Sequence, residues 1–576
     1  MSDTISTATI LGIKIDTQTT KLFLFDVVDA KYTLLATSEA KTTHSAPYND
    51  IREGLFKAID HLQKVTGKFI LDNEMNIIFP SQEDGNGVDL ISISYGFLNF
   101  ASIITAGLLE NVSIESNNNL IQLTHLSHTD QISLNDSRTL EEVFNSIQNK
   151  RPDIILLSGG TENGATKSVI RLLEIILFCT KNLPGKEIPE FIYAGNSQLG
   201  EKFEEVFKNQ QLKFHKTGNI RPSIHTESLL PALNTINEIT KKFLPKIIPG
   251  LDFLFSFPNS NPIPYSQAYG TMVKFLSNIN PEKNEKVLLV DFNKEIFCIA
   301  GAQNGKLVLF SQNNPLLNDS DNITMDLEST EIIEWLEDEI NFKQVQNYLL
   351  NKSIHPHSIP ENNEELSLEK AVNKYLLKKL FNSFQKQSGI EDNSFHQILI
   401  NGDILTGYLS QQELILFLLD TIQPIGISNL FNDQYGIMPV LGSIAQNNSI
   451  LPIHLMESNA ISLLAKVFSI PCKGKDGTPV LNLKVEFKDG TYLEELIVKG
   501  TITKLPITSG QPVKIFIDVI GNIEMKSVLK QYETGILVQA GTVGIVFDTR
   551  NRPLSLPKID QERHILLKKW REDLDS

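Results

Sequence analysis

The stretch Leu11–Asp26, LGIKIDTQTTKLFLFD, decides the fold that we expect for this chain. An apolar strand runs into a Thr-rich turn and then into a second apolar strand, which predicts a β-hairpin. Thr17, Thr19 and Thr20 bring hydroxyl groups to the turn. Backbone N–H groups in such a turn form a concavity that attracts anions. The hairpin therefore predicts an anion-facing turn near the start of the chain.

A second stretch, Lys286–Gly301 (KVLLVDFNKEIFCIAG), has the same outline of strand, polar turn and strand. Two such hairpins in one chain predict two similar lobes. Between them, Asp153–Ser158 (DIILLS) is a continuously apolar strand, which is typical of the buried middle of a parallel sheet. Strands alternate with helices such as Ala165–Cys179, so the fold class is α/β with a doubly wound sheet. The Pro- and Asn-rich segment Phe257–Pro264 marks the boundary between the lobes.

Four further features are predicted in the second lobe and in the rest of the chain. We expect an acidic helix at Thr330–Ile340 that holds Trp335, and a short strand at Ile437–Leu441. From about Asn459 the pattern becomes strand-rich, which predicts a small all-β sandwich or barrel followed by a charged helix at Gln561–Leu574. The predicted domains are a first lobe over residues 1–256, a second lobe over 257–458 and a β-rich domain with a terminal helix over 459–576.

Length and charge exclude several function classes. The 576 residues are too many for one core, and a formal charge of -16 argues against nucleic acid or an anionic membrane as the main partner. Cys179, Cys298 and Cys472 are far apart in apolar surroundings, which is typical of buried packing in a reducing compartment. No secretory signal opens the chain and its apolar runs are too short to span a bilayer. We expect a cytoplasmic protein.

A glycine-rich loop after the strand Asp153–Ser158 is the best local candidate for a ligand site. Glycines let the backbone approach a ligand, and the helix that follows attracts anions. A phosphate-binding P-loop needs Lys and Ser/Thr directly after its last glycine, whereas Ala165 and Thr166 stand there. A tight turn at the sheet edge and a ligand-facing loop of another kind both stay open. The candidate residues are Gly159, Gly160, Thr161, Asn163 and Gly164.

Motifs for hydrolytic, metal or thiol chemistry are not found in the sequence. It has no Gly-X-Ser-X-Gly elbow, Cys-X-X-Cys pair or His-Glu-X-X-His helix, so we assign no catalytic residue and no metal ligand. Arg550, Arg552 and Arg563 are expected at the surface, where they would form salt bridges.

Segments across the first 450 residues resemble one known family. The most specific are Pro152–Ala165 (PDIILLSGGTENGA), Phe191–Asn196 (FIYAGN) and Thr217–Ile224 (TGNIRPSI). Asn347–Val372 and Ile422–Ala445 match in the second lobe. The chain thereby resembles the MutL accessory proteins of adenosylcobalamin-dependent glutamate mutase, which are unrelated to the mismatch-repair protein of that name.

The resemblance implies the actin-like ATPase fold of sugar kinases and heat-shock chaperones, which is ribonuclease H-like. Its two lobes clamp ATP between paired phosphate hairpins. It also implies a role in assembling or reactivating a cobalamin mutase, and this is an analogy of fold and family. Near the C-terminus, Gly541–Pro557 (GTVGIVFDTRNRPLSLP) resembles a segment of some longer members.

The first hairpin departs from the family pattern Asp-Ile-Gly-Ser-Thr-X-Thr-Lys. Lys14 replaces the carboxylate that would organise Mg²⁺, and Asp16 replaces the glycine that admits the phosphate. Both residues fall on one strand face, so a pair between them would fill the metal site. In the second hairpin Asp291 remains, but Asn293 and Lys294 replace both glycines. The vestigial nucleotide positions are Lys14, Asp16, Thr17, Thr19, Thr20, Asp291, Asn293 and, in the adenosine-side turn, Gly402.

These replacements favour a pseudo-ATPase: a MutL-like accessory or scaffold protein that acts through protein contacts. Its partner would be a cobalamin-dependent mutase or an intact MutL-like paralogue, and neither ATP nor Mg²⁺ is expected as a cofactor because phosphoryl transfer depends on positioned Mg²⁺. Two alternatives remain. One is an ATP-dependent reactivase in which Lys14 neutralises phosphate charge without a metal. The other is a binding module for a different anionic ligand at the Gly159–Gly164 loop.

Overall fold

The computed structural model forms two compact units. Unit 1 comprises residues 1–268 with 439–448, and unit 2 comprises residues 269–438 with 449–576. The predicted division into three domains at residues 256 and 458 stays a prediction. The residues described are 8–97, 101–135, 137–181, 183, 188–279, 281–293, 295–317, 329–355, 358–388, 392–402, 407–445, 450–456 and 460–575.

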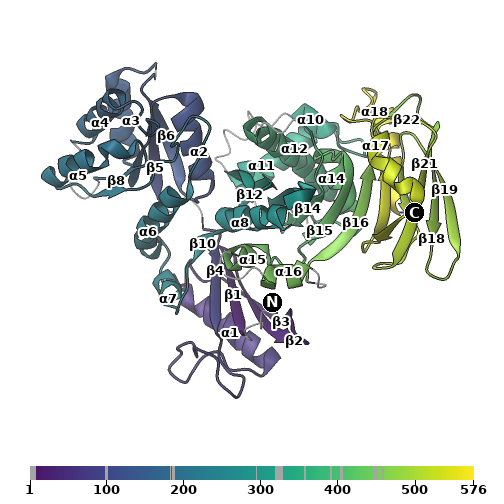
Figure 1. Ribbon diagram of the computed structural model, residues 1–576, viewed down its shortest axis with the longest axis horizontal. Coiled ribbons are helices and arrows are strands. Elements are labelled where there is room, and N and C mark those ends of the chain that lie inside the picture. The colour runs from purple at the N-terminus through teal and green to yellow at the C-terminus, as the bar shows by residue number, and fades with distance from the viewer. Residues whose placement is uncertain are drawn as a thin grey trace. The chain divides into compact units, whose positions relative to one another are not determined.

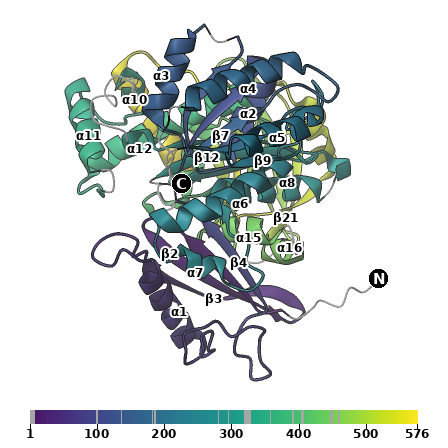
Figure 2. The ribbon, with the colours of Figure 1, turned by 90° about the vertical axis from the view of Figure 1, so that its left-hand side faces the viewer.

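The first sheet of unit 1 is built on the predicted hairpin. Its strand order is β10-β4-β1-β2-β3. The three strands β1, β2 and β3 are antiparallel neighbours, and β4 runs parallel to β1. Helix α1 (Arg52–Thr66) packs on β2 and β3 (Figure 2). The strands are β1 (Ile10–Ile15), β2 (Thr19–Val28), β3 (Lys31–Lys41), β4 (Leu90–Tyr95) and β10 (Ile263–Pro264).

A second sheet of unit 1 is entirely parallel and confirms the doubly wound prediction. Its order is β6-β5-β7-β8-β9, so the chain changes direction of winding between β5 and β7. Figure 1 shows α3, α4 and α5 on one side of it and α2 on the other. The strands are β5 (Ser102–Gly107), β6 (Ser127–Ser133), β7 (Ile154–Leu157), β8 (Glu190–Tyr193) and β9 (Phe214–Lys216). The helices are α2 (Glu115–Gln122), α3 (Leu140–Lys150), α4 (Lys167–Thr180) and α5 (Gly200–Asn209), with the π-helix η1 (Glu110–Ile114) before α2.

The sheet of unit 2 repeats the first sheet of unit 1 and then extends it. Its order is β13-β12-β11-β14-β15-β16-β24-β20. The five strands from β13 to β15 show the same order and directions as β3 to β10: three antiparallel strands, then two parallel ones. The two units thus contain sheets of the same topology, as the paired hairpins predicted, which agrees with the actin-like fold that the family resemblance implied. The strands are β11 (Lys286–Phe292), β12 (Ile296–Gln303), β13 (Lys306–Asn313), β14 (Gln397–Asn401), β15 (Gly426–Asn432), β16 (Ser462–Ser469), β24 (Gly544–Asp548) and β20 (Ile502–Leu505).

Two predicted elements differ from the structure. The segment Ile437–Leu441 is not a strand, because helix α15 (Met438–Ile444) lies there. The carboxylate of Asp433 accepts the N–H groups of Ile437 and Met438, at 2.9 and 2.7 Å, and so satisfies the first amides of a helix. The acidic helix is also shorter than predicted, since α10 ends at Ile333 and the buried Trp335 follows it in a turn.

Other helices cover the sheets or link them. α12 and α14 pack against each other, and the predicted terminal helix is confirmed as α18, whose Trp570 is buried. The remaining helices are α6 (Leu230–Ile247), α7 (Leu251–Phe255), α8 (Tyr265–Asn278), α10 (Ser329–Ile333), α11 (Phe342–Ile354), α12 (Asn363–Ser388), α14 (Gln411–Thr421), α16 (Ile450–Met456), α17 (Lys526–Leu529) and α18 (Asp560–Asp575).

The all-β region of unit 2 has a core of its own. A four-stranded antiparallel sheet, β19-β18-β21-β23, packs its apolar side on residues such as Phe468 and Phe547, while β16, β24 and β20 belong to the eight-stranded sheet. An Asp-Gly turn joins β18 to β19, with Gly490 at φ 83°. The remaining strands are β17 (Cys472–Lys473), β18 (Pro479–Glu486), β19 (Tyr492–Val498), β21 (Pro512–Val519), β22 (Asn522–Ile523) and β23 (Ile536–Gln539).

Within the described ranges, no helix is long and apolar enough to cross a membrane.

Candidate functional site

The turn of the first hairpin already contains an anion, the carboxylate of Asp16. Its Oδ1 accepts the backbone N–H groups of Gln18 at 2.9 Å and Thr19 at 2.8 Å, and the Thr19 hydroxyl lies 3.4 Å away. These N–H groups are the ones that a phosphate oxygen would use in a turn of this kind. An incoming phosphate would therefore meet a negative charge that already occupies its donors.

Lys14 and Asp16 do not form the ion pair that their shared strand face predicted. Among the described ion pairs none joins them; Lys14 is 5% exposed and its Nζ lies 5.5 Å from the centroid of the Tyr265 ring. The Tyr265 hydroxyl donates to Asp16 Oδ2 at 3.4 Å. The two residues are thus linked through one aromatic side chain, because β1 ends at Ile15 and Asp16 already bends into the turn.

The three threonines of the turn separate. Thr19 faces Asp16, whereas the Thr20 hydroxyl is buried and shares a hydrogen bond of 2.9 Å with the Thr42 hydroxyl at the end of β3. Thr17 is half-buried in the turn. The structure therefore brings one of the three predicted hydroxyl groups to the Asp16 carboxylate and turns another away.

Removal of the Asp16 carboxylate should destabilise unit 1 modestly. We expect Asp16→Ala to lower the free energy of unfolding by about 1–2 kcal/mol, since it leaves two turn amides without their charged acceptor. Urea unfolding followed by circular dichroism measures the change. Asp60→Ala is the control, because its pairing with Lys64 is exposed on α1, and a loss there as large as that of Asp16→Ala would contradict the role of the turn amides.

The second hairpin and the β14 end meet in unit 2. Asp291 is buried at the end of β11, and its Oδ2 accepts from Asn293 Nδ2 at 2.6 Å. Gly402 follows β14 with φ 113°, and a Cβ there would lie 2.5 Å from both the N and the O atom of Phe292. The structure thus brings Asp291, Asn293 and Gly402 together, while Lys294 lies outside the described residues.

The Gly159–Gly164 loop lies at the carboxyl edge of the parallel sheet, beside the switch of winding between β5 and β7. Such switch points are the usual ligand crevices of doubly wound sheets. The loop's polar groups are, however, tied to neighbouring loops. The Glu162 carboxylate accepts from Ser197 and, at 2.8 Å, from Asn219 Nδ2, which also donates to the Gly160 carbonyl at 3.0 Å. Gln198 Nε2 donates to Asn163 Oδ1 at 2.9 Å.

Internal packing already explains the loop's glycines. Gly159 has φ 125° and a Cβ there would lie 2.8 Å from Leu108 Cγ, while at Gly160 it would lie 2.6 Å from the Ala165 carbonyl oxygen. Gly164 closes a turn through its N–H, which donates to the Thr161 carbonyl at 2.9 Å. The contacts of the Gly159–Gly164 loop are those of a tight turn. A ligand-binding role of this loop stays a proposal.

The side chains of Arg550, Arg552 and Arg563 are buried, so their predicted surface location is wrong. Arg550 is 1% exposed; its Nη1 lies 2.8 Å from Asp420 Oδ1 and its Nη2 lies 2.9 Å from Asp548 Oδ2. Its guanidinium also lies 4.5 Å from the centroid of the Trp570 ring.

The alternation of side-chain directions along β24 could have indicated that Arg550 and Asp548 lie close together. Asp548 and Arg550 are two residues apart after an apolar strand, and in extended chain such residues share a face. Arg552 contacts the same Asp548 carboxylate, and Arg563 pairs with Asp560 at 2.7 Å. Arg550 and Arg552 therefore join separate elements of the fold, whereas Arg563 pairs within α18, and these three buried side chains form no basic surface patch.

His125 in unit 1 is a buried titratable group that sequence reasoning missed. It is 3% exposed, its Nδ1 lies 3.1 Å from the Phe97 carbonyl, and its ring packs edge-on against Tyr95 and Tyr265. Burial lowers the pKa of His125 to about 4. The folded protein therefore holds this imidazole neutral at pH 7.

Acid should weaken unit 1 through His125. Its folded pKa is below the ordinary value of about 6.5, so the unfolded chain binds the proton more tightly and stability falls as the pH drops from 6.5 towards 4. We expect a loss of roughly 2 kcal/mol between pH 7 and pH 5 from this residue. Urea unfolding at both pH values tests it, and His125→Phe should reduce the loss by that amount. An equal loss in the variant would contradict the assignment.

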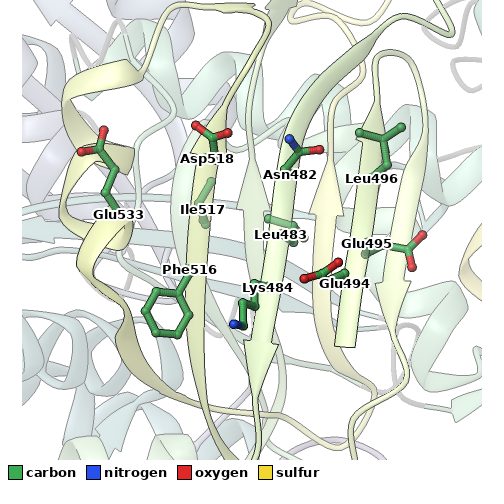
Figure 3. Close-up of a pocket in the computed structure, with 10 residues that line it drawn as sticks. All are labelled: Asn482, Leu483, Lys484, Glu494, Glu495, Leu496, Phe516, Ile517, Asp518 and Glu533. Atoms are coloured by element: carbon green, nitrogen blue, oxygen red, sulfur yellow. The ribbon is translucent and has the colours of Figure 1, made fainter. Parts of the chain in front are cut away.

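The outer face of the four-stranded sheet bears a broad open cavity of about 800 Å³ (Figure 3). Three carboxylates and one ammonium line it on this face: Glu494, Asp518, Glu533 and Lys484. Apolar side chains are interleaved with them, including Phe516 and the 49% exposed Leu496. We call this surface the acidic sheet face.

Comparisons with known proteins place the chain beside one family. Residues 10–293 match the family model described as MutL protein. A curated relative, Protein MutL of Clostridium tetanomorphum, is 29% identical over 102 residues, which are 18% of this chain and 20% of that protein. The aligned region thus spans a fifth of the relative's length.

Similar solved structures include nucleotide-using enzymes. Acetone carboxylase in its nucleotide-free structure is 9% identical with a TM-score of 0.34, and the match covers 92% of this chain and 87% of that one. Glycerol kinase of Plasmodium falciparum with ADP is 11% identical with a TM-score of 0.30, covering 79% and 93%.

Proposed function

Because the chain is related to the MutL family through residues 10–293, we propose that it is a pseudo-ATPase accessory protein. It acts through protein contacts in the assembly or reactivation of an adenosylcobalamin-dependent mutase. The partner is the mutase itself or an intact MutL-like paralogue. A cytoplasmic location is part of the proposal, and the three buried free cysteines support it.

The observation that carries the proposal is the Asp16 carboxylate on the amides of the first turn. Phosphoryl transfer depends on donors that hold the phosphates and on Mg²⁺ that neutralises their charge. In this chain an internal carboxylate binds those donors, and Lys14 stands where the family has a metal-organising Asp. At the second hairpin, Asn293 hydrogen-bonds Asp291, the one remaining acidic position. The residues present therefore do not fit Mg·ATP.

Titration of the purified chain with Mg·ATP tests the loss of nucleotide function. We expect no binding heat and no phosphate release above a protein-free blank. Micromolar binding would overturn the pseudo-ATPase. Steady turnover that disappears in Lys14→Ala and Asp291→Ala, but persists in the exposed control Lys64→Ala, would establish the reactivase with an atypical site instead.

The acidic sheet face is the surface that we propose for the partner contact. Its carboxylates outnumber its ammonium groups by three to one, so the complementary occupant is a cationic segment of the partner that also carries apolar side chains. Exposed apolar residues beside it, Tyr492 at 62% and Leu537 at 72%, extend the contact surface.

Charge reversal tests this surface. Glu494→Lys with Asp518→Lys should weaken binding to the cognate mutase or paralogue at least tenfold in a surface-immobilised assay at low salt. The matched control, Glu201→Lys with Glu204→Lys, places the same charges on the exposed side of α5 and should leave binding unchanged. Equal binding by both variants would exclude the face, and no binding of either partner by the unmodified chain would overturn the accessory role.

A second candidate function is a binding module at the Gly159–Gly164 loop, which the switch-point position favours. Native mass spectrometry of the protein purified under mild conditions should then reveal a bound anionic compound that is lost in Gly160→Val. A mass equal to that of the chain alone would exclude a bound ligand, and the loop would then be a tight turn only.

A further inference from the structure

A cavity of about 450 Å³ lies in unit 2 at the amino ends of β14 and β15, at the opposite strand ends from Gly402. Three polar side chains of its floor come from neighbouring strands. Gln397 is directly opposite Asn429 across β14 and β15, and Asn429 is directly opposite Lys466 across β15 and β16. Because opposed residues in a sheet project from the same face, two carboxamides and one ammonium form a row in the cavity.

Lys466 in this row has no acidic partner. Its Nζ donates to Asn429 Oδ1 at 3.3 Å, and within the described residues no carboxylate oxygen lies within ion-pairing distance. Glu285, the carboxylate of the same cavity, instead accepts from Gln397 Nε2 at 2.9 Å. Burial lowers the pKa of Lys466, and no neighbouring negative charge acts in the other direction.

Two other poorly exposed lysines of unit 2 are different, since each of them has a carboxylate at normal ion-pair distance. Lys352 pairs with Glu369 at 2.8 Å, and Lys374 pairs with Asp420 at 2.7 Å. An ammonium group that loses water without gaining a counter-charge is costly. The cost at Lys466 would be removed by an anion bound in the cavity.

The rest of the cavity mixes polar residues, Ser394, His396 and Gln531, with apolar ones, and its volume is close to that of a small-molecule site. Met525, Val528 and Tyr532, from the segment that covers the strands, form the opposite wall. The Tyr532 ring packs edge-on against Phe468, with the centroids 5.4 Å apart, and burial raises the pKa of Tyr532 so that it stays a hydroxyl donor. Cavities of this size with an apolar wall and a few polar groups are typical of sites for small organic ligands.

We propose that this cavity binds a small organic monocarboxylate, with its carboxylate on Lys466 and its apolar part against Tyr532 and Met525. The charges select a monoanion, because the cavity offers one ammonium and the nearby Glu285 repels further negative charge. Asn429 and Gln397 supply amide groups beside the carboxylate. This site is separate from both hairpins and does not depend on the proposed accessory function.

Phenylacetate is the probe, and phenylacetamide is its uncharged counterpart of the same shape. Titration calorimetry with the full chain should give saturable binding of phenylacetate and at least tenfold weaker binding of the amide. Lys466→Met should weaken phenylacetate binding at least tenfold. Lys473→Met, a lysine on β17 that is 67% exposed, should bind as the unmodified chain does. No saturable binding, equal binding of acid and amide, or full binding by Lys466→Met would each overturn the proposal.

Chemical labelling keeps the proposal testable if Lys466→Met fails to fold. The unmodified chain is treated with acetic anhydride at pH 7, and peptide mass spectrometry measures the acetylation of Lys466 and of Lys473. Phenylacetate should reduce labelling of Lys466 several-fold and leave Lys473 unchanged, while phenylacetamide should protect neither. Labelling of Lys466 that is unaffected by phenylacetate would overturn the site.

Discussion

Replacement of Arg550 by alanine should lower the free energy of unfolding of unit 2 by about 3–5 kcal/mol. The guanidinium lies between two carboxylates that are 1% and 0% exposed, those of Asp420 and Asp548. Burial alone would raise the pKa of Asp548, but Arg550 and Arg552 outweigh it and hold that pKa well below its usual range. Without Arg550 a charged carboxylate remains buried with one partner fewer.

Tryptophan fluorescence during urea unfolding measures this loss directly. The chain has two tryptophans, and one of them, Trp570, stacks on Arg550 itself. Arg550→Lys should be nearly as damaging as Arg550→Ala, because an ammonium cannot bridge both carboxylates with the same forked geometry. The control Arg571→Ala removes a partly exposed pair with Glu337 and should change stability by no more than about 1 kcal/mol. Equal losses in control and variant would refute the buried-pair account.

The protonation of Asp548 sets the pH range of this contribution. Since the folded pKa is depressed, the stabilisation is complete above the unfolded pKa of about 3.9 and is lost as the pH falls towards the folded value. The difference between Arg550→Ala and the unmodified chain should therefore be constant from pH 5 to pH 8. If the difference in unfolding free energy grew steadily over that range, a titratable group other than Asp548 would have to be responsible.

Gly402→Ala should lower the free energy of unfolding by about 2–6 kcal/mol, which is the second large effect. A side chain at φ 113° strains the backbone by about 1–3 kcal/mol. Its Cβ would also lie 2.5 Å from the backbone N and O atoms of Phe292, so a strand must move and add roughly 1–3 kcal/mol. Loss of stability in urea unfolding checks the sum.

Gly407→Ala is a matched control for Gly402→Ala. It lies a few residues later, and a Cβ there would meet nothing within 4 Å. We expect its stability to change by less than about 1 kcal/mol, and in the stabilising direction if the helical conformation at that residue dominates. If both variants behaved alike, the close approach of the β14 end to the second hairpin would be wrong.

The lobes and their hairpins were predictable because period-two apolar patterns are local. Leu11–Asp26 and Lys286–Gly301 each contain both strands of a pair and the turn between them, so neighbouring residues carry the whole signal. The strand predicted at Ile437–Leu441 was wrong for a related reason. A short apolar run does not distinguish a strand from a buried helix, and the helix-starting Asp433 lies four residues before it.

The candidate site was less predictable because its contacts are long-range or depend on backbone direction. Asp420 lies 130 residues from Arg550. No residue close to Arg550 in the sequence therefore indicates that the Arg550 side chain is buried. Asp16 was expected on the same strand face as Lys14 and was therefore given the wrong partner. Alternation along a strand pairs it with Lys14, whereas the chain leaves the strand at Ile15 and directs the carboxylate to the amides of Gln18 and Thr19.

The strand order of the eight-stranded sheet has a consequence for synthesis on the ribosome. Strand β16 has β15 on one side and β24 on the other, and about seventy-five residues separate the end of β16 from the start of β24. At roughly 5–20 residues per second, the nascent chain exposes the edge of β16 for several seconds before its neighbour emerges. Unpaired edges of this kind are sites of aggregation. A chaperone that binds nascent chains should therefore crosslink to β16 while translation is paused before residue 544, and release it once β24 has emerged.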